Sequence, residues 1–202
     1  MANTPERRSG LLNLRFATLV GITLAAAAAR LLPHPPNFTP VAAQALFGGA
    51  YFSNRIAAFA VPLAAMLLSD LALGLLRFGA AIFSSMPFVY ASFVLTVLLG
   101  GWVRRRHCSP LAIAGAALAS SIVFFIVSNF GVWLQWQLYP KTLEGLAACY
   151  VAAIPFFRNS LAGDTVFTLV LFGGFALAKR YIPALRQPVP VAPRKDMQDQ
   201  RA

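Results

Sequence analysis

Two aspartates stand in or beside long apolar runs, where a carboxylate could do chemistry. Asp70 lies fourteen residues past Ile56 in one apolar run, and Asp164 lies just before the last run, Val166–Ala178. A carboxylate in hydrocarbon is costly, so it usually faces a bundle interior or a wet cavity and pairs with a cation. For Asp70 we expect such a buried pair, which is either structural or part of a site. Three arginines are candidate partners: Arg30, Arg77 and Arg158.

Asp164 has a second interpretation as a helix cap. A carboxylate at the first residue of a helix accepts hydrogen bonds from free backbone N–H groups and is favoured by the helix dipole. Because Asp164 precedes the last apolar run, the sequence favours this capping role and leaves a ligand contact as the alternative.

The segment Pro33–Pro40 carries polar side chains on a stiff backbone. It has four prolines in eight residues, so it cannot be helical and is predicted to be an extended loop. His34 and Asn37 are its candidate ligand contacts. Alternatively, His34 is an ordinary solvated histidine.

A second polar segment, Asn129–Pro140, is predicted to be an irregular outer segment in which amides alternate with aromatic residues. Asn129, Trp133 and Trp136 are its candidate contacts. Ligand pockets combine apolar and aromatic walls with a few polar groups. An aromatic belt at the membrane interface would have the same composition, and that alternative stays open.

Catalytic and metal-binding motifs are missing from the sequence. We find no Walker lysine motif, no HExxH and no nucleophile elbow, and Cys108 and Cys149 match no zinc spacing. We therefore expect no enzyme activity, no metal and no cofactor. Any ATP-driven work would need a partner protein.

Composition excludes a soluble globular domain. Hydrophobic residues make up 58% of the 202-residue chain and charged residues only 11%, whereas soluble domains have about 25% charged residues. The net charge of +11 suggests nucleic acid as a partner, but Lys and Arg gather at the ends of apolar runs and form no basic stripe. The sequence therefore predicts a membrane protein that does not bind nucleic acid.

The apolar runs predict an all-α, polytopic membrane protein with six transmembrane helices. A span needs about 20 apolar residues, and the second run is short enough to be re-entrant on length alone. The six runs are Phe16–Leu32, Val41–Phe52, Ile56–Leu76, Phe88–Val103, Leu111–Val127 and Leu161–Ala178.

Charge sets the predicted orientation. With six spans, thirteen of the 17 Lys and Arg residues fall on one side, which the positive-inside rule makes cytoplasmic. Both termini then lie in the cytoplasm of a bacterium, and the protein resides in the inner membrane. The basic run Arg104–His107 would anchor this topology and attract anionic lipid headgroups. Residues 1–10 would be a cytoplasmic segment, 11–182 the transmembrane domain and 183–202 a disordered cytoplasmic tail.

Small residues form a ladder on one face of the first predicted helix: Ala17, Gly21, Ala25 and Ala29. Small faces let helix backbones approach closely in lipid. The ladder predicts either packing within this protein or docking of a partner membrane subunit.

The run Leu46–Phe52 followed by Pro62–Gly74 is similar to a stretch of the substrate-binding S components of energy-coupling-factor (ECF) transporters. The chain also resembles an uncharacterised bacterial family of six-helix membrane proteins, through three strings: Pro33–Pro40, Asn129–Leu134 and Cys149–Asn159.

The S-component resemblance implies a solute-binding subunit that captures a small molecule on the extracytoplasmic side, under Pro33–Pro40 and Asn129–Ser160. It also implies that Ala25 and Ala29 dock a coupling transmembrane subunit, which works with ATPase subunits. The substrate-binding candidates are Asp70, Asn37, His34, Asn129, Trp133, Trp136, Arg158 and Asp164. The alternative function is a non-transporting scaffold or assembly subunit of a larger membrane complex.

Overall fold

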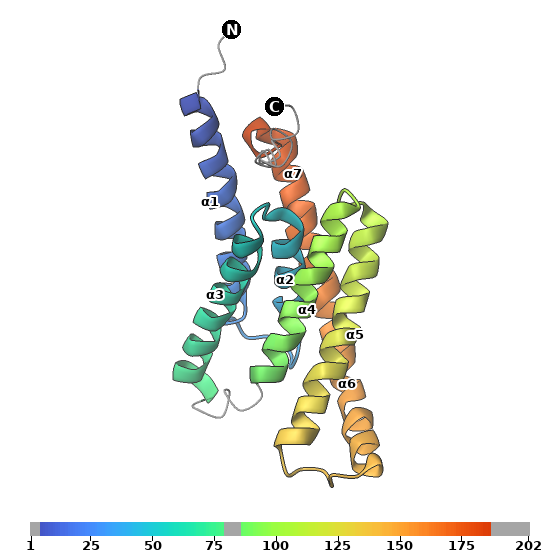
Figure 1. Ribbon diagram of the computed structural model, residues 1–202. Helices are drawn as coiled ribbons and strands as arrows, with labels where there is room; N and C mark the ends of the chain where they lie inside the picture. The colour runs from blue at the N-terminus through green and yellow to red at the C-terminus, as the bar shows by residue number, and fades with distance from the viewer. Residues whose placement is uncertain (1–4, 79–85, 187–202) are drawn as a thin grey trace, which may run out of the picture.

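The computed structural model describes residues 5–78 and 86–186, and within them every regular element is helical (Figure 1). Six helices form the bundle, the last being a continuous rod made of α6, a π-helical turn (η3) and α7. Their bounds are α1 Pro5–Ala29, α2 Val41–Tyr51, α3 Arg55–Leu73, α4 Met86–Arg105, α5 Pro110–Gln135, α6 Leu143–Thr168, η3 Leu169–Gly173 and α7 Gly174–Tyr181.

The helices have the length and surface of a membrane protein. Four of them are long and apolar enough to cross a membrane: Arg55–Leu76, Met86–Arg105, Pro110–Gln135 and Leu143–Tyr181. Large apolar side chains cover their outer faces, among them Leu75, Leu111 and Leu169, which are 88%, 85% and 68% exposed. Such a surface suits lipid and not water. The predicted all-α membrane bundle is confirmed.

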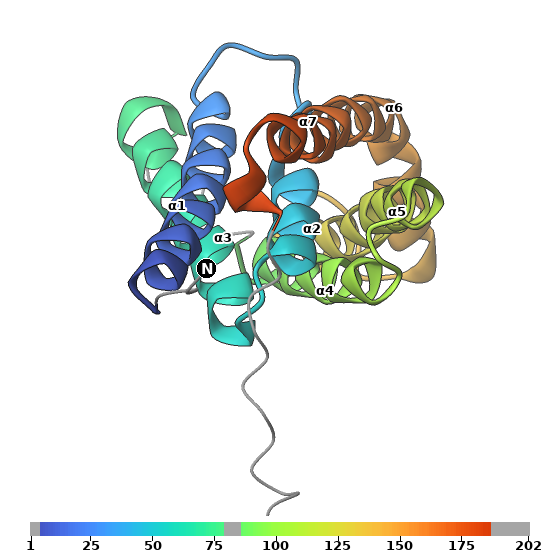
Figure 2. The same ribbon diagram turned by 90° about the horizontal axis from the view of Figure 1, so that it is seen from above.

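The short helix α2 is the centre of the bundle. All eleven of its residues are buried, and Figure 2 shows it enclosed by the other helices. Glycine allows this close approach: a Cβ on Gly49 would lie 2.0 Å from the Val97 carbonyl oxygen of α4. At 1.5 Å per residue α2 is about 16 Å long, roughly half the thickness of the hydrocarbon core.

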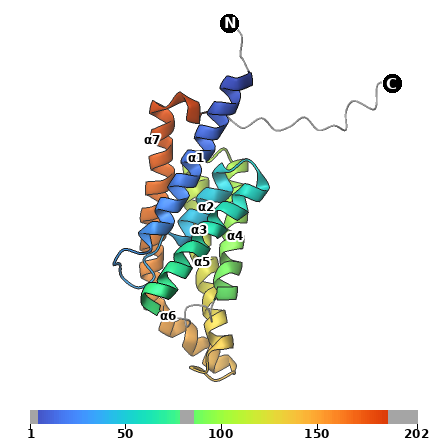
Figure 3. The same cartoon turned by 90° about the vertical axis from the view of Figure 1, so that its left-hand side faces the viewer.

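The two ends of the bundle differ. The outer ends of α1 and α7 lie at one end together with the α4–α5 turn, and we name this the terminal end (Figures 1 and 3). The α5–α6 turn lies at the opposite end, which we name the loop end. The connection between α1 and α2, residues 30–40, lies toward the loop end.

The expected outer segment Asn129–Ser160 is mostly helical, which corrects the sequence prediction. Helix α5 continues to Gln135 and α6 already begins at Leu143. The Asn129 side chain, which suggested a loop, is satisfied within the helix instead, since it donates to the Phe125 carbonyl at 2.8 Å. Pro155 stands inside α6 without ending it.

The predicted capping role of Asp164 is wrong, because α6 begins at Leu143 and Asp164 lies inside it. Thr142 is the cap of α6, and its hydroxyl accepts from the Gly145 N–H at 3.2 Å. Asp164 lies more than five turns further along, within the bundle.

The expected domain boundaries shift at both ends. Helix α1 already begins at Pro5, and residues 1–4 lie outside the described part. The predicted disordered tail is ordered at its start, because Pro183–Leu185 form a 3₁₀ turn with Leu185 fully buried. Arg15 of α1 donates to the Leu185 carbonyl at 3.1 Å. Residues 187–202 of that tail lie outside the described residues.

Candidate functional site

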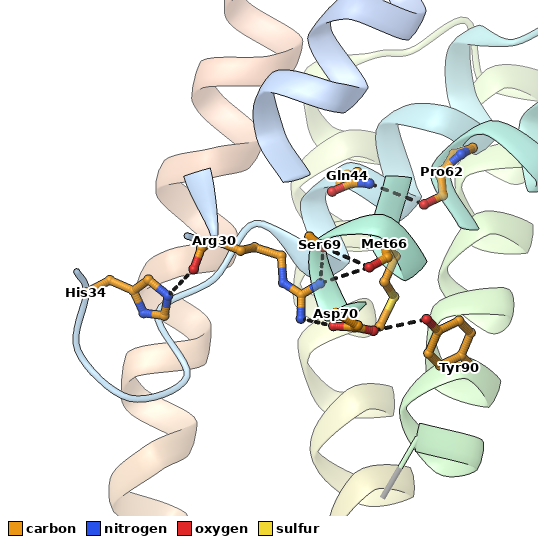
Figure 4. A network of polar contacts seen from close by, with 8 residues as sticks. All are labelled: Arg30, His34, Gln44, Pro62, Met66, Ser69, Asp70 and Tyr90. Carbon is orange, nitrogen blue, oxygen red and sulfur yellow. Dashed lines mark hydrogen bonds and ion pairs between the residues drawn. The ribbon is translucent and has the colours of Figure 1, made fainter. Parts of the chain in front are cut away.

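An ion pair joins the end of α1 to α3. Arg30 follows the last residue of α1, and its Nη2 lies 2.5 Å from Oδ1 of Asp70. The guanidinium also donates to the Ser69 hydroxyl and, at 3.4 Å, to the Met66 carbonyl. Figure 4 shows these groups converging on the arginine. The predicted burial of Asp70 with a cation is confirmed, and Arg30 is the partner; the side chain of Arg77 lies outside the described part.

Both carboxylate oxygens of Asp70 are occupied. The Tyr90 hydroxyl of α4 donates to Oδ2 at 3.0 Å (Figure 4), and the residue is 3% exposed. Asp70 therefore joins α1, α3 and α4, and it does not line the cavity described next. Asp70 and Arg30 therefore form a structural ion pair.

A cavity of about 320 Å³ lies between the α1–α2 connection and helices α2, α4, α5 and α6. We name it the loop-side cavity. Its polar lining residues are Arg30, Asn37, Thr39, Ser128, Asn129, Ser160 and Asp164. Its apolar walls include four phenylalanines: Phe124, Phe125, Phe156 and Phe157.

The proline-rich loop forms one wall of this cavity through Asn37 and Thr39, and α6 is narrow where the loop crosses it. A Cβ on Gly163 would lie 3.0 Å from the Thr39 nitrogen, so only glycine leaves the loop this room. Asn159 donates to the Pro36 carbonyl at 3.0 Å, and the rings of Phe38 and Phe167 lie 5.7 Å apart. Asn37 adopts a positive φ of 63°, a conformation that asparagine tolerates better than most residues.

The structure brings together three of the eight predicted substrate-binding residues. Asn37, Asn129 and Asp164 all line the loop-side cavity, although they come from a loop and two helices. The other five, Asp70, His34, Trp133, Trp136 and Arg158, do not.

His34 and Arg158 face outward. The His34 ring is exposed and its nitrogens lie 2.9 Å from the Pro35 carbonyl and 3.3 Å from the Arg30 carbonyl (Figure 4). Arg158 is exposed on α6.

The tryptophans stabilise the α5–α6 turn. Trp133 donates from Nε1 to the Pro140 carbonyl at 2.9 Å. Lys141 lies over the Trp133 ring and donates to the Trp136 carbonyl at 2.9 Å. The two tryptophans therefore do not close over Asp70.

Sequence reasoning missed the phenylalanines and serines of the cavity. Phe156, Ser160 and Asp164 are four residues apart along α6, and Phe124 and Ser128 have the same spacing along α5. Residues four apart share a helix face. This signal was present in the sequence, but it has meaning only once both segments are known to be helical.

Asp164 also lines a second cavity, of about 610 Å³, which runs between α5 and the α6–α7 rod toward the terminal end. We name it the terminal-side cavity. Its walls are mainly apolar, with His107, Cys108 and Lys179 near the α4–α5 turn and α7. Burial raises the pKa of the Cys108 thiol, so the thiol is neutral at physiological pH. Among the residues described, Asp164 is the one that lines both cavities.

The small-residue ladder of α1 faces away from the bundle. Ala17, Gly21 and Ala25 are exposed and Ala29 is half-buried. The buried face is a different one, formed by Leu19, Thr23, Ala26 and Ala27. The ladder is therefore available for contact with lipid or another protein, and packing within this chain uses other residues.

These features define a helical membrane protein with a covered polar and aromatic cavity. The chain belongs to the family described as a family of unknown function, DUF6580, whose match covers residues 11–185. No curated protein and no solved structure matches the chain.

Proposed function

We propose that this protein is the membrane-embedded solute-binding subunit of an ECF-type uptake system and that it captures a small molecule in the loop-side cavity. The observation that carries the proposal is the cavity itself, in which amide and hydroxyl groups stand among four phenylalanine rings. Small-molecule sites have this composition: apolar walls for affinity and a few polar groups for orientation.

The cavity has the size of a site for a small solute. Ligand pockets typically measure about 300–1,000 Å³, and this one, at about 320 Å³, is at the lower limit. A molecule with a flat apolar body and polar ends fits such walls, because phenylalanine faces contact the body while Asn37, Asn129 and Ser160 hydrogen-bond the ends. A vitamin-sized compound is the expected class.

The cover of the cavity supports binding from the loop end. Residues 33–40 form no regular helix, and one hydrogen bond and one ring contact fix them to α6. In the proposed orientation the basic α4–α5 turn and both termini face the bacterial cytoplasm. The loop end then faces the extracytoplasmic side of the inner membrane, where the solute is collected.

The exposed ladder of α1 supports a partner subunit. Helix α1 lies at the side of the bundle beside α3 (Figures 1 and 2), so its small face is open along the membrane. In this proposal Ala25 and Ala29 contact a coupling transmembrane subunit, and separate ATPase subunits supply the energy.

The test is mass spectrometry of small molecules that co-purify with the detergent-solubilised protein. Ala153 is buried and lines the cavity, whereas its neighbour Ala152 is exposed on α6. Ala153→Leu should fill the cavity and remove the co-purified compound, and the matched control Ala152→Leu should retain it. Equal retention by both variants, or no compound with the parent protein, would refute the proposal.

The exposed ladder alone would also suit a scaffold subunit. That second function predicts that Ala25→Leu and Ala29→Leu release partner membrane proteins, while no small molecule is found with the parent protein.

A further inference from the structure

Thr168 differs from the other hydroxyl residues of the described helices. Eight of these residues donate to the carbonyl four residues earlier: Thr18, Thr23, Ser92, Thr96, Ser120, Ser128, Ser160 and Thr165. This is the usual way in which a hydroxyl is satisfied inside a membrane helix. The Thr168 Oγ1 atom is buried and has no hydrogen-bond partner, and the residue is 5% exposed.

Thr168 lines the same cavity as two other residues with oxygen-bearing side chains. Asp164 is one turn earlier on α6, and Ser121 of α5 donates to its Oδ2 at 2.6 Å. All three residues line the terminal-side cavity, and none is more than 5% exposed. A buried donor or acceptor without a partner costs about 1–3 kcal/mol. The unpartnered Thr168 hydroxyl beside Asp164 and Ser121 therefore points to a bound ligand.

The backbone is irregular at the same place. Directly after Thr168 the helix changes to the π-helical turn Leu169–Gly173, and Leu169, Phe172 and Gly173 also line this cavity. Single π-turns inside α-helices widen the helix and are frequent at functional sites.

The charge of the cluster is not balanced within the described part of the chain. Asp70 has Arg30 as its partner, but no described Lys, Arg or His forms an ion pair with Asp164. A carboxylate deep in a membrane helix needs a countercharge or a proton.

From this geometry we propose that Asp164, Ser121 and Thr168 bind one alkali-metal cation at the wall of the terminal-side cavity. One carboxylate balances one positive charge, which favours a monovalent over a divalent ion. The three groups offer only hard oxygen ligands, and the described residues contain no cluster of His, Cys, Asp or Glu that would hold a transition metal.

The site goes beyond solute capture, because it would place an ion on the described residue that is shared by the loop-side and the terminal-side cavity. Asp164 lines each of them. Occupation of the site would neutralise the one carboxylate that the solute cavity shares with the opposite half of the bundle.

The experiment is thermal unfolding of the purified full-length protein in detergent, at fixed pH and ionic strength, with NaCl or KCl replacing choline chloride. Choline serves as the reference, because methyl groups cover its charge and it cannot be coordinated by three oxygens as a bare alkali cation can. We expect the unfolding midpoint to rise with NaCl or KCl and to saturate. Thr168→Val keeps the shape of the side chain and removes the hydroxyl, so it should weaken the cation response roughly tenfold, the cost of one contact to a charged group.

Two further variants complete the design. Thr165→Val is the matched control, because Thr165 lines the same cavity but its hydroxyl already donates to the Leu161 carbonyl at 2.7 Å; it should keep the full response. Asp164→Asn should abolish the response, and if that variant does not fold, the comparison of Thr168→Val with Thr165→Val decides alone. Equal midpoints in all three salts, or equal responses of these two threonine variants, would overturn the proposal. The assay needs no solute, so its result is independent of the proposed function.

Discussion

Gly163 of α6 lies directly beneath Thr39, so close that a Cβ on the glycine would stand 3.0 Å from the Thr39 nitrogen. This contact seats the proline-rich loop over the loop-side cavity. The position is therefore sensitive to a single added methyl group, although it lies in a helix where alanine is otherwise the better residue.

Gly163→Ala should displace the loop and lower the unfolding midpoint. In an open helix the same change stabilises by roughly 0.5–1 kcal/mol, and Gly115 of α5 offers that case, because nothing lies within 4 Å of its ideal Cβ. Thermal unfolding of both variants in detergent is the measurement. If Gly163→Ala is as stable as Gly115→Ala, the loop is not seated as described.

Asp70→Asn should destabilise the protein strongly, because it leaves Arg30 buried without its countercharge. Breaking one partner of a buried pair costs about 3–5 kcal/mol. The double variant Arg30→Met with Asp70→Asn removes both charges and should recover part of the loss. A double-mutant cycle of unfolding free energies checks this coupling, and additive losses would contradict it.

Trp133→Ala and Asn129→Ala should separate two roles that the sequence left mixed. Trp133 holds the α5–α6 turn through its bond to the Pro140 carbonyl, so its loss should lower stability and leave co-purified solute unchanged. Asn129 lines the cavity, and its loss should reduce the solute. Mass spectrometry of both variants is the measurement. Loss of the solute with Trp133→Ala and its retention with Asn129→Ala would place the binding site at the tryptophans instead.

The proposed orientation predicts which residues are accessible from outside the cell. In a chain with Cys108 and Cys149 replaced by serine, an impermeant thiol reagent should label Asn37→Cys and not Ser109→Cys. Asn37 lies in the exposed proline-rich loop and Ser109 caps α5 beside the basic turn. Labelling of Ser109→Cys in intact cells would contradict the proposed topology.

Hydrophobicity and charge were sufficient to predict the bundle and the burial of Asp70 with an arginine, since both follow from the cost of leaving polar groups in lipid. The length of α5 and α6 was not predictable in the same way. Asn129, Trp133 and Pro155 resemble loop residues in sequence, yet they lie within helices, where the Asn129 side chain is satisfied by the carbonyl of Phe125.

The orientation of the α1 ladder could not be predicted either. In water the apolar face of a helix is the buried one, but in lipid both faces are apolar and only contacts distinguish them. Thr23 and Ala27 turn inward while Ala25 turns outward, and no difference in hydrophobicity separates Ala25 from Ala27.

The central position of α2 has a consequence for biogenesis. This helix is only about half as long as the hydrocarbon core is thick, has no surface for lipid and fits against α4 through Gly49 and Gly100. It emerges from the ribosome before α4 and cannot reach its final place until α4 has been synthesised. We therefore expect that insertion of this chain is not strictly sequential and that the second helix reaches its final place only when the fourth one packs against it.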